Sequence, residues 1–174
     1  AVVAVQTASN IESGWVPRWT IGYTTRQSII LEFSSTIVCL IITGKVGSNI
    51  ASEIGTMRVT EQIDAMEVSG TNPFKYLVVT RILAVTLMLP LLVIFGDVIA
   101  LFGSALVENL KGEVAFSLYF NQVVESIEFG DILPATIKSF FFGFAIGLVG
   151  CFKGYYCEKG TEGVGIAANT AVVF

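Results

Sequence analysis

The sequence predicts an all-α protein that crosses a membrane several times. Of its 174 residues, 53% are hydrophobic and only 14% are charged, whereas soluble domains carry about 25% charged residues. A helix needs ~20 mostly apolar residues to cross the hydrocarbon core of a bilayer. Three segments meet that length, at about 28–51, 77–107 and 132–152. The shortage of charge therefore indicates a bilayer rather than a large soluble core.

Both ends of the sequence are also apolar. Residues 1–6 are expected to be the tail of an earlier span, and residues 163–174 the start of a later one. We therefore expect residues 1–174 to be a single transmembrane domain with about five spans, three complete and two truncated, cut from a longer subunit. Pro90 lies near the middle of the second complete span and can supply a kink there, because proline removes a helical hydrogen bond.

The composition excludes several functions. The net charge is −4, so the basic surface of a nucleic-acid-binding protein is missing. There is no histidine, which is the commonest metal ligand and general base. No GxxxxGK[ST] phosphate loop occurs, and the three cysteines form no CxxC pair. We expect no catalytic residue, no metal site and no cofactor in this chain.

The positions of Lys and Arg orient the spans, because cytoplasmic loops are enriched in them. Four bases lie between the first two complete spans or at their edges: Lys45, Arg58, Lys75 and Arg81. Lys153 and Lys159 follow the third span, whereas the segment 108–131 has Lys111 against five acids. We therefore expect the segment between the first two complete spans and the segment after the third span to lie on the cytoplasmic side. The segment 7–27, with two arginines, does not fit this rule.

The segment 52–69 is expected to be an amphipathic cytoplasmic helix between two spans. Val59, Ile63 and Met66 form an apolar stripe with helical spacing, and most acidic residues lie off it. Gly70 is a suitable residue to end the helix, and Asn72 followed by Pro73 is a suitable start for the next.

Such a helix could lie on the lipid surface or dock into a groove of a cytoplasmic partner. Helices that bind membrane surfaces usually have a basic polar face. This helix is acidic, with Arg58 as its single base, so anionic headgroups would repel it. The charge favours protein docking.

Four ionisable side chains fall inside the predicted spans: Glu32, Lys45, Asp97 and Lys138. Charges are costly in a bilayer, so each is a functional candidate. Lys45 and Lys138 lie near enough to span ends to reach water, and Glu32 could face a water-filled vestibule. Asp97 lies deepest, where a structural pair and a polar cavity are equally good explanations.

Small residues recur with the spacing that lets helices approach closely in lipid. Gly47, Ala51 and Gly55 lie four apart, and so do Gly143 and Gly147. The pattern favours packing within the chain, with a homodimer contact as the alternative.

Two stretches carry a resemblance to a known family. GKVGSNIASEIGTMRVTEQIDAMEVSGTNPFKYLVVTRILA, residues 44–84, and GTEGVGIAANTAVV, residues 160–173, resemble the two signature regions of the MlaE family of ABC-transporter permeases. The order and spacing also match, and together they cover about a third of the chain. The chain departs from the family pattern at Lys45, where arginine is common, and at Ser34–Ser35, where Gly-Pro is common.

The resemblance implies a permease that moves phospholipid or a similar hydrophobic molecule between the inner and outer membranes, located in the bacterial inner membrane as a homodimer. Its partners would be a cytoplasmic ABC ATPase, which binds ATP and Mg²⁺ and supplies the energy, and an MCE-domain substrate-binding protein. The segment 52–69 would be the coupling helix that contacts the ATPase. The residues expected in that contact are Glu53, Arg58, Thr60, Glu61, Gln62, Asp64 and Met66. The residues expected to line a lipid pocket are Phe33, Ile37, Leu40 and Ile41.

Two other functions fit the sequence without the resemblance. An ion-coupled transporter or channel would use Glu32, Asp97 and Lys138 as an ion path, and it would work without an ATPase. A membrane scaffold would bind partners but carry no lipid.

Overall fold

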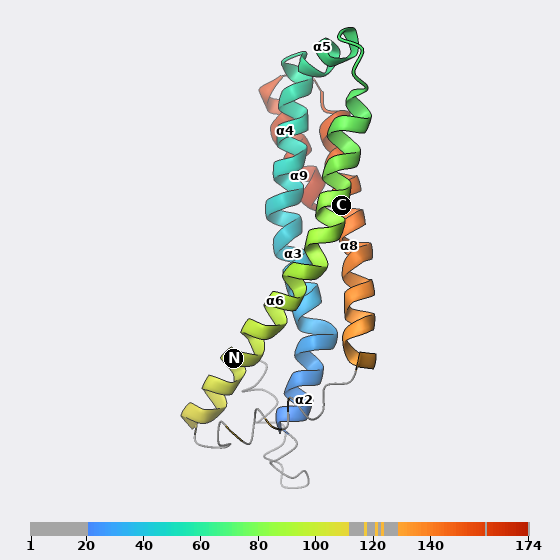
Figure 1. The fold of residues 1–174 in the computed structure, drawn as a ribbon. Helices are drawn as coiled ribbons and strands as arrows, with labels where there is room; N and C mark the ends of the chain where they lie inside the picture. Colours follow the sequence, from blue (N-terminus) through green and yellow to red (C-terminus); the bar gives the residue numbers. More distant parts are fainter. Residues whose placement is uncertain are drawn as a thin grey trace. The chain divides into compact units, whose positions relative to one another are not determined.

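A computed structural model describes residues 21–111, 129–158 and 160–173, together with the isolated positions 117, 121 and 123. All regular secondary structure in these residues is helical (Figure 1). The predicted partial span at 1–6 lies outside the described residues. The all-α prediction is confirmed for the part of the chain that the structure describes.

The first long helix is built from five consecutive elements. These are α2 (Ile21–Ser28), the π-helical turn η2 (Ile29–Phe33), α3 (Ser34–Ile42), a second π-helical turn η3 (Thr43–Gly47) and α4 (Ser48–Val59). A short helix, α5 (Gln62–Val68), follows a break. The next long helix begins with the π-helical turn η4 (Phe74–Val79) and continues as α6 (Thr80–Lys111), which contains Pro90. The remaining helices are α8 (Phe129–Tyr155) and α9 (Thr161–Val173).

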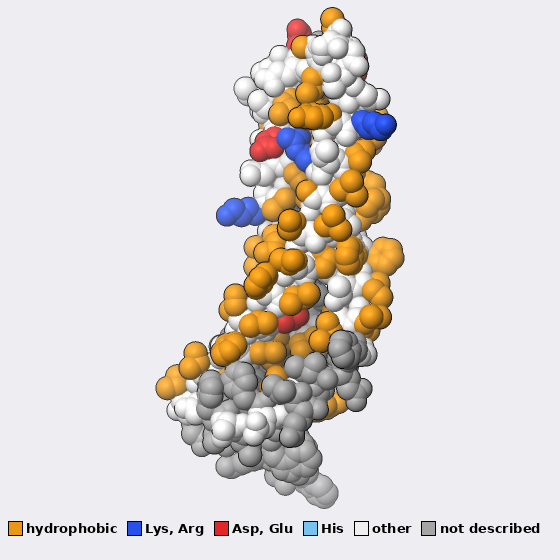
Figure 2. All heavy atoms as spheres, viewed as in Figure 1, with side chains coloured by type: hydrophobic (Ala, Val, Ile, Leu, Met, Phe, Trp, Pro, Cys, Tyr) orange, Lys and Arg blue, Asp and Glu red, His pale blue; other side chains and the backbone are white. Residues whose placement is uncertain are grey.

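Among the described residues, three helices are long and apolar enough to span a membrane. They are Ile29–Val59, Phe74–Val107 and Ile132–Tyr155. Large hydrophobic side chains along them are exposed, including Leu40, Leu87 and Ile99, and Figure 2 shows hydrophobic side chains spread along the described surface in view. A multi-pass membrane protein leaves such side chains to the lipid. The three complete spans predicted from the sequence are confirmed, each with somewhat longer bounds.

The predicted boundary between the first span and the coupling helix is wrong. The helix expected to end at residue 51 continues to Val59, and only Gln62–Val68 forms a separate helix. Residues 52–59 contain no proline and a single glycine, so nothing in them stops a helix that has already begun. The predicted helix 52–69 is therefore the last turns of α4 plus α5.

The internal contacts divide the chain into two compact units. One comprises Ala1–Ile37 with Leu92–Lys138, and the other Val38–Leu91 with Ser139–Phe174. The second unit contains α4, α5, α9 and the adjoining parts of α6 and α8. It holds both stretches that resemble the permease signatures.

Within the second unit, glycines of α8 contact the backbones of α6 and α4. A Cβ atom at Gly143 would lie 3.0 Å from Thr86 Cα, and one at Gly147 would lie 3.1 Å from Ile82 Cα. Further along α8, a Cβ at Gly150 would lie 3.1 Å from the Gly47 carbonyl oxygen. Real Cβ atoms rarely come so close, so these helices approach to a distance that only glycine permits.

The small residues of the first span are used in the same packing. Ala51 lies against Gly154 of α8, and Gly55 faces Cys157 and Val164 in the segment after α8. Helix α9 packs against α4 (Figure 1). Of the two alternatives for these small residues, the structure shows the contact within the chain.

Gly154→Ala is expected to destabilise the full-length subunit by about 1–3 kcal/mol, the usual effect of overpacking. The added methyl group would lie 2.8 Å from the Ala51 carbonyl oxygen and 2.9 Å from Ile54 Cβ. Thermal unfolding in detergent measures the effect. Gly103→Ala is the control, because a Cβ there meets no atom within 4 Å and alanine favours a helix interior. Equal unfolding temperatures for the two variants would contradict the packing described here.

Candidate functional site

The candidate site is the elbow, residues 53–81, where the chain leaves the first span and enters the second. Helix α4 ends at Val59, and the backbone N–H of Thr60, the next residue, still donates to the Thr56 carbonyl at 3.0 Å. The next residue, Glu61, has φ 60° and ψ 16°, the left-handed conformation. This conformation costs a residue with a Cβ about 1–2 kcal/mol. The strained residue separates α5 from α4.

Helix α5 ends with two hydrogen bonds that close its last turn. Gly70 N–H donates to the Glu67 carbonyl at 3.0 Å, and Thr71 N–H donates to the Met66 carbonyl at 3.1 Å. Gly70 has φ 81°, which glycine adopts without strain. Asn72 Oδ1 then accepts from Lys75 N–H at 3.3 Å and caps the next helix. The predicted roles of Gly70 and Asn72 are confirmed.

The apolar stripe of the elbow faces inward around Ile63. Ile63 and Ile54 are both 0% exposed, so α5 is anchored on the end of α4. Met66 is half-buried, while Glu61, Asp64 and Glu67 are exposed. The elbow therefore presents an acidic outer surface on an anchored helix.

Arg58 links the tip of the elbow to α8. Its Nη1 donates to Asp64 Oδ1 at 2.7 Å, and its guanidinium lies 6.0 Å from the centre of the Tyr155 ring. The Tyr155 ring in turn meets the edge of Phe74 at 6.3 Å between centroids. The ion pair is exposed and contributes little to stability by itself, but it neutralises the one base of α4–α5 and leaves the acids to set the surface charge.

A second ion pair connects the two spans themselves. Arg81 Nη2 donates to Glu53 Oε2 at 2.9 Å, with side-chain exposures of 21% and 59%. The other terminal nitrogen, Arg81 Nη1, is buried and has no hydrogen-bond partner among the described residues. An unsatisfied buried donor costs about 1–3 kcal/mol, so this pair is not arranged for maximum stability.

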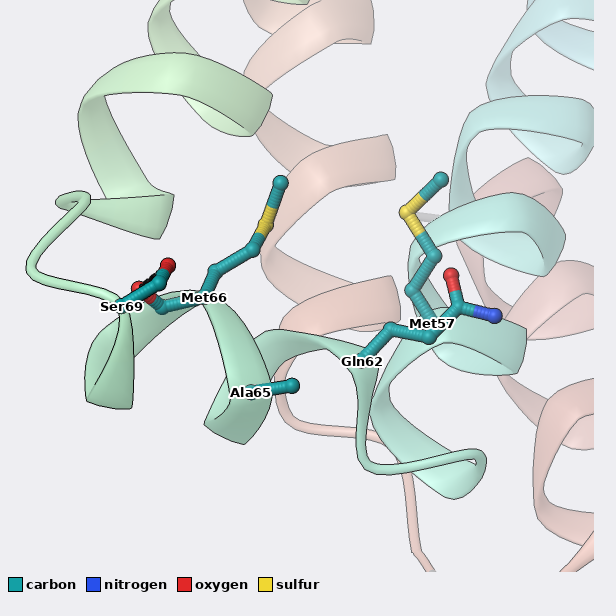
Figure 3. Close-up of a pocket in the computed structure, with 5 residues that line it drawn as sticks. All are labelled: Met57, Gln62, Ala65, Met66 and Ser69. Carbon is teal, nitrogen blue, oxygen red and sulfur yellow. Dashed lines mark hydrogen bonds between the residues drawn. The ribbon is translucent and has the colours of Figure 1, made fainter.

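An open groove of about 320 Å³ lies between the end of α4 and α5. Figure 3 shows the Met57 and Met66 side chains standing on its two sides, with Gln62 and Ala65 between them and Ser69 at one end. Methionine is flexible and polarisable, so a groove that it lines adapts to an apolar side chain of a partner. The elbow thus combines an adaptable apolar groove with an acidic rim.

Three lining residues of this groove were missed by the sequence analysis: Met57, Ala65 and Ser69. A continuous helix would have placed Met57 far from Ser69. The break at Glu61 brings them to one groove by turning α5 away from the axis of α4. A glutamate in the left-handed conformation leaves no signal in sequence patterns, because glycine and asparagine are the usual residues there.

The other predicted contact residues lie around the groove. Gln62 and Met66 line it, and Thr60 and Glu61 form the break that creates it. Arg58 and Asp64 pair with each other beside it. Glu53 lies apart from the groove, further along α4, in its pair with Arg81.

The predicted lipid-pocket residues lie on one helix and are all exposed: Phe33, Ile37, Leu40 and Ile41. The predicted intramembrane charges Glu32, Lys45 and Lys138 are exposed as well. Asp97 differs, because its Oδ1 is buried and lacks a hydrogen-bond partner within the described chain. Ser34 of α3 is buried, and its hydroxyl donates at 3.5 Å to the carbonyl of Val93, which lies one helical turn before Asp97 on α6.

The second signature stretch forms α9 and the turn before it. Gly160 has φ 113°, and a Cβ at Gly163 would collide with the Glu158 backbone. A groove of about 240 Å³ runs between the end of α8 and α9, lined by residues that include Lys153, Tyr156 and Thr170. The glycines of this motif thus allow the tight turn after α8 that brings α9 back against α4.

Comparison with known proteins finds a family model described as "Permease MlaE" that matches residues 1–174. A Rickettsia prowazekii protein called a probable ABC transporter permease is 41% identical over 146 residues, which are 84% of this chain and 56% of that protein. A probable ABC transporter permease of Synechocystis is 36% identical over 154 residues, 88% of this chain and 59% of that protein.

The Arabidopsis thaliana protein TRIGALACTOSYLDIACYLGLYCEROL 1, chloroplastic, is 33% identical over 142 residues, 82% of this chain and 41% of that protein. The chain therefore spans about half the length of the curated relatives that it matches.

The two left-handed residues that flank α5 should respond oppositely to substitution. Gly70→Ala is expected to destabilise the full-length subunit by about 1 kcal/mol, because alanine is strained at φ 81°. Glu61→Gly is expected to cause no loss, because it removes strain of the same kind. Thermal unfolding of both variants in detergent compares them. A larger loss for Glu61→Gly than for Gly70→Ala would contradict the backbone geometry of the elbow.

Proposed function

Because the chain belongs to the MlaE permease family, we propose that it is the membrane-spanning part of an ABC-transporter permease that moves phospholipid or a similar hydrophobic molecule between two membranes. Relatives named probable ABC transporter permeases support the permease role. The name of the Arabidopsis relative includes the name of a glycerolipid, and this supports a lipid cargo. ATP hydrolysis would take place in a separate subunit.

The elbow is the observation that carries this proposal. The sequence contains no phosphate loop, so energy from ATP has to enter this chain through a contact with another protein. The elbow offers such a contact: an anchored helix with an open groove, held between two spans. A push on α5 would reach both spans directly.

The charge of the elbow supports a protein partner rather than the lipid surface. Glu61, Asp64 and Glu67 are exposed, and Arg58 is already paired with Asp64. Anionic headgroups repel such a surface. We infer a partner face with basic residues around one apolar side chain that enters the methionine-lined groove, as in helix-in-groove recognition.

The same proposal includes the remaining partners. The permease would act as a homodimer in the bacterial inner membrane, bound to an ATPase that holds ATP and Mg²⁺ and to an MCE-domain protein. The exposed apolar face of Phe33, Ile37, Leu40 and Ile41 supports a surface for lipid or for the second copy, because apolar side chains face acyl chains or another helix in a membrane.

Ala65→Phe is expected to weaken the association of the full-length permease with its ATPase at least ten-fold, because the larger side chain fills the groove without changing charge. Val68→Phe is the matched control. Val68 lies on the same helix and is 90% exposed, but it does not line the groove. Copurification from membranes, quantified for both subunits, gives the readout. Equal ATPase recovery with the two variants would contradict groove docking.

Asp97 favours a second candidate function, an ion-coupled transporter or channel. A carboxylate oxygen that is buried at span depth without a hydrogen-bond partner in the described chain is what an ion or proton site would contain. Such a transporter would not need an ATPase.

Asp97→Asn separates the two candidate functions. An amide keeps the shape of the carboxyl group but cannot carry its charge or exchange its proton. If the chain is an ABC permease, ATP-driven lipid movement by the reconstituted full-length complex is expected to stay within about three-fold of wild type, a barrier change of at most about 0.7 kcal/mol. Abolished transport with unchanged ATPase association would favour the ion-coupled function.

A further inference from the structure

Glu53 and Arg81 join the two spans on either side of the elbow. Arg81 is the second residue of α6, directly after η4, and Glu53 lies in the middle of α4, 28 residues earlier. Of the two ion pairs among the described residues, this one connects two spans, while Arg58–Asp64 lies at the tip of the elbow. The ion pair therefore ties α4 to α6 through polar side chains.

The surroundings of the pair show that its helices are packed tightly. A Cβ at Gly147 would lie 3.1 Å from Ile82 Cα, beside Arg81, and a Cβ at Gly154 would lie 3.1 Å from Ala51 Cα, near Glu53. Cys151, between these glycines, has its sulfur 3.9 Å from the Val78 carbonyl oxygen. At the level of the ion pair, α8 thus contacts both α4 and α6.

The pair is poorly suited to a purely stabilising role. Arg81 Nη1 is buried without an acceptor in the described chain, whereas the Glu53 side chain is 59% exposed, and an ion pair open to solvent contributes little to stability. Apolar residues would not tie the helices in the same way, however. In a membrane, lipid tails are as apolar as leucine, so apolar side chains give two helices little reason to stay together.

We propose that Glu53 and Arg81 are positioning residues for ATP-driven transport. Their ion pair makes α4 and the start of α6 move as one body when the partner pushes on α5. The joints on either side of α5, at Glu61 and Gly70, are the places where the backbone bends. This inference rests on the proposed function and assigns to Glu53 a role inside the permease rather than in the ATPase contact.

The test measures lipid moved per ATP hydrolysed by the full-length permease reconstituted with its ATPase and partner proteins. Glu53→Gln and Arg81→Met each remove one charge. The double variant Glu53→Arg with Arg81→Glu restores the pair with reversed charges. A second double variant, Glu53→Leu with Arg81→Met, keeps the packing and removes the tie. Glu162→Gln, which removes an exposed carboxylate in the first turn of α9 and outside the elbow, is the control.

We expect both single variants and the apolar double variant to assemble and hydrolyse ATP, but to move at least five-fold less lipid per ATP. The charge-reversed variant should recover to within two-fold of wild type, and Glu162→Gln should match wild type. The proposal is overturned if the apolar double variant assembles and transports normally, if charge reversal gives no recovery, or if Glu53→Gln mainly prevents ATPase binding. A wild-type complex without ATP-dependent lipid movement would instead reject the proposed function.

Discussion

The close approach of α8 to the backbones of α4 and α6 is the constraint on which the rest of the second unit depends. In lipid there is little hydrophobic force between helices, so contact area and backbone proximity hold them together. Glycines of α8 supply that proximity over about three turns, first against α6 and then against α4. The elbow lies at the end of this packed block, and its position follows from the helices that it joins.

The elbow combines stiffness with two bends. Ile63 is fully buried against the end of α4, and this burial anchors α5. The bends at Glu61 and Gly70 set the direction of α5 and open the groove between Met57 and Met66. A surface of this kind can receive a partner and pass a displacement to the spans, because packed helices shift as units rather than deform continuously.

The sequence was sufficient to predict the features that arise from local chemistry. The three spans followed from length and hydropathy, and the roles of Gly70 and Asn72 followed from helix-capping preferences. The packing of Gly47, Ala51, Gly143 and Gly147 also followed from spacing, although the sequence left a homodimer contact as an alternative. These features depend on a residue and its near neighbours, so one sequence contains enough information to find them.

Features that depend on the chain folding back could not be predicted. The first span was expected to end at residue 51, where a polar stretch begins, but helices continue through polar residues when no breaker follows. The groove and the Glu53–Arg81 pair join residues from different elements, and pairing across 28 residues leaves no periodic pattern. The fold class was therefore more predictable than the site.

The central claim is that the elbow is the place where an ATPase contacts this permease. The most direct measurement places a photoreactive side chain at position 65, in the groove, in the full-length subunit in native membranes, and identifies the cross-linked product by mass spectrometry. The account predicts a cross-link to an ABC ATPase, at an apolar residue surrounded by basic ones. Cross-links to lipid alone, with the ATPase present in the same membranes, would contradict it.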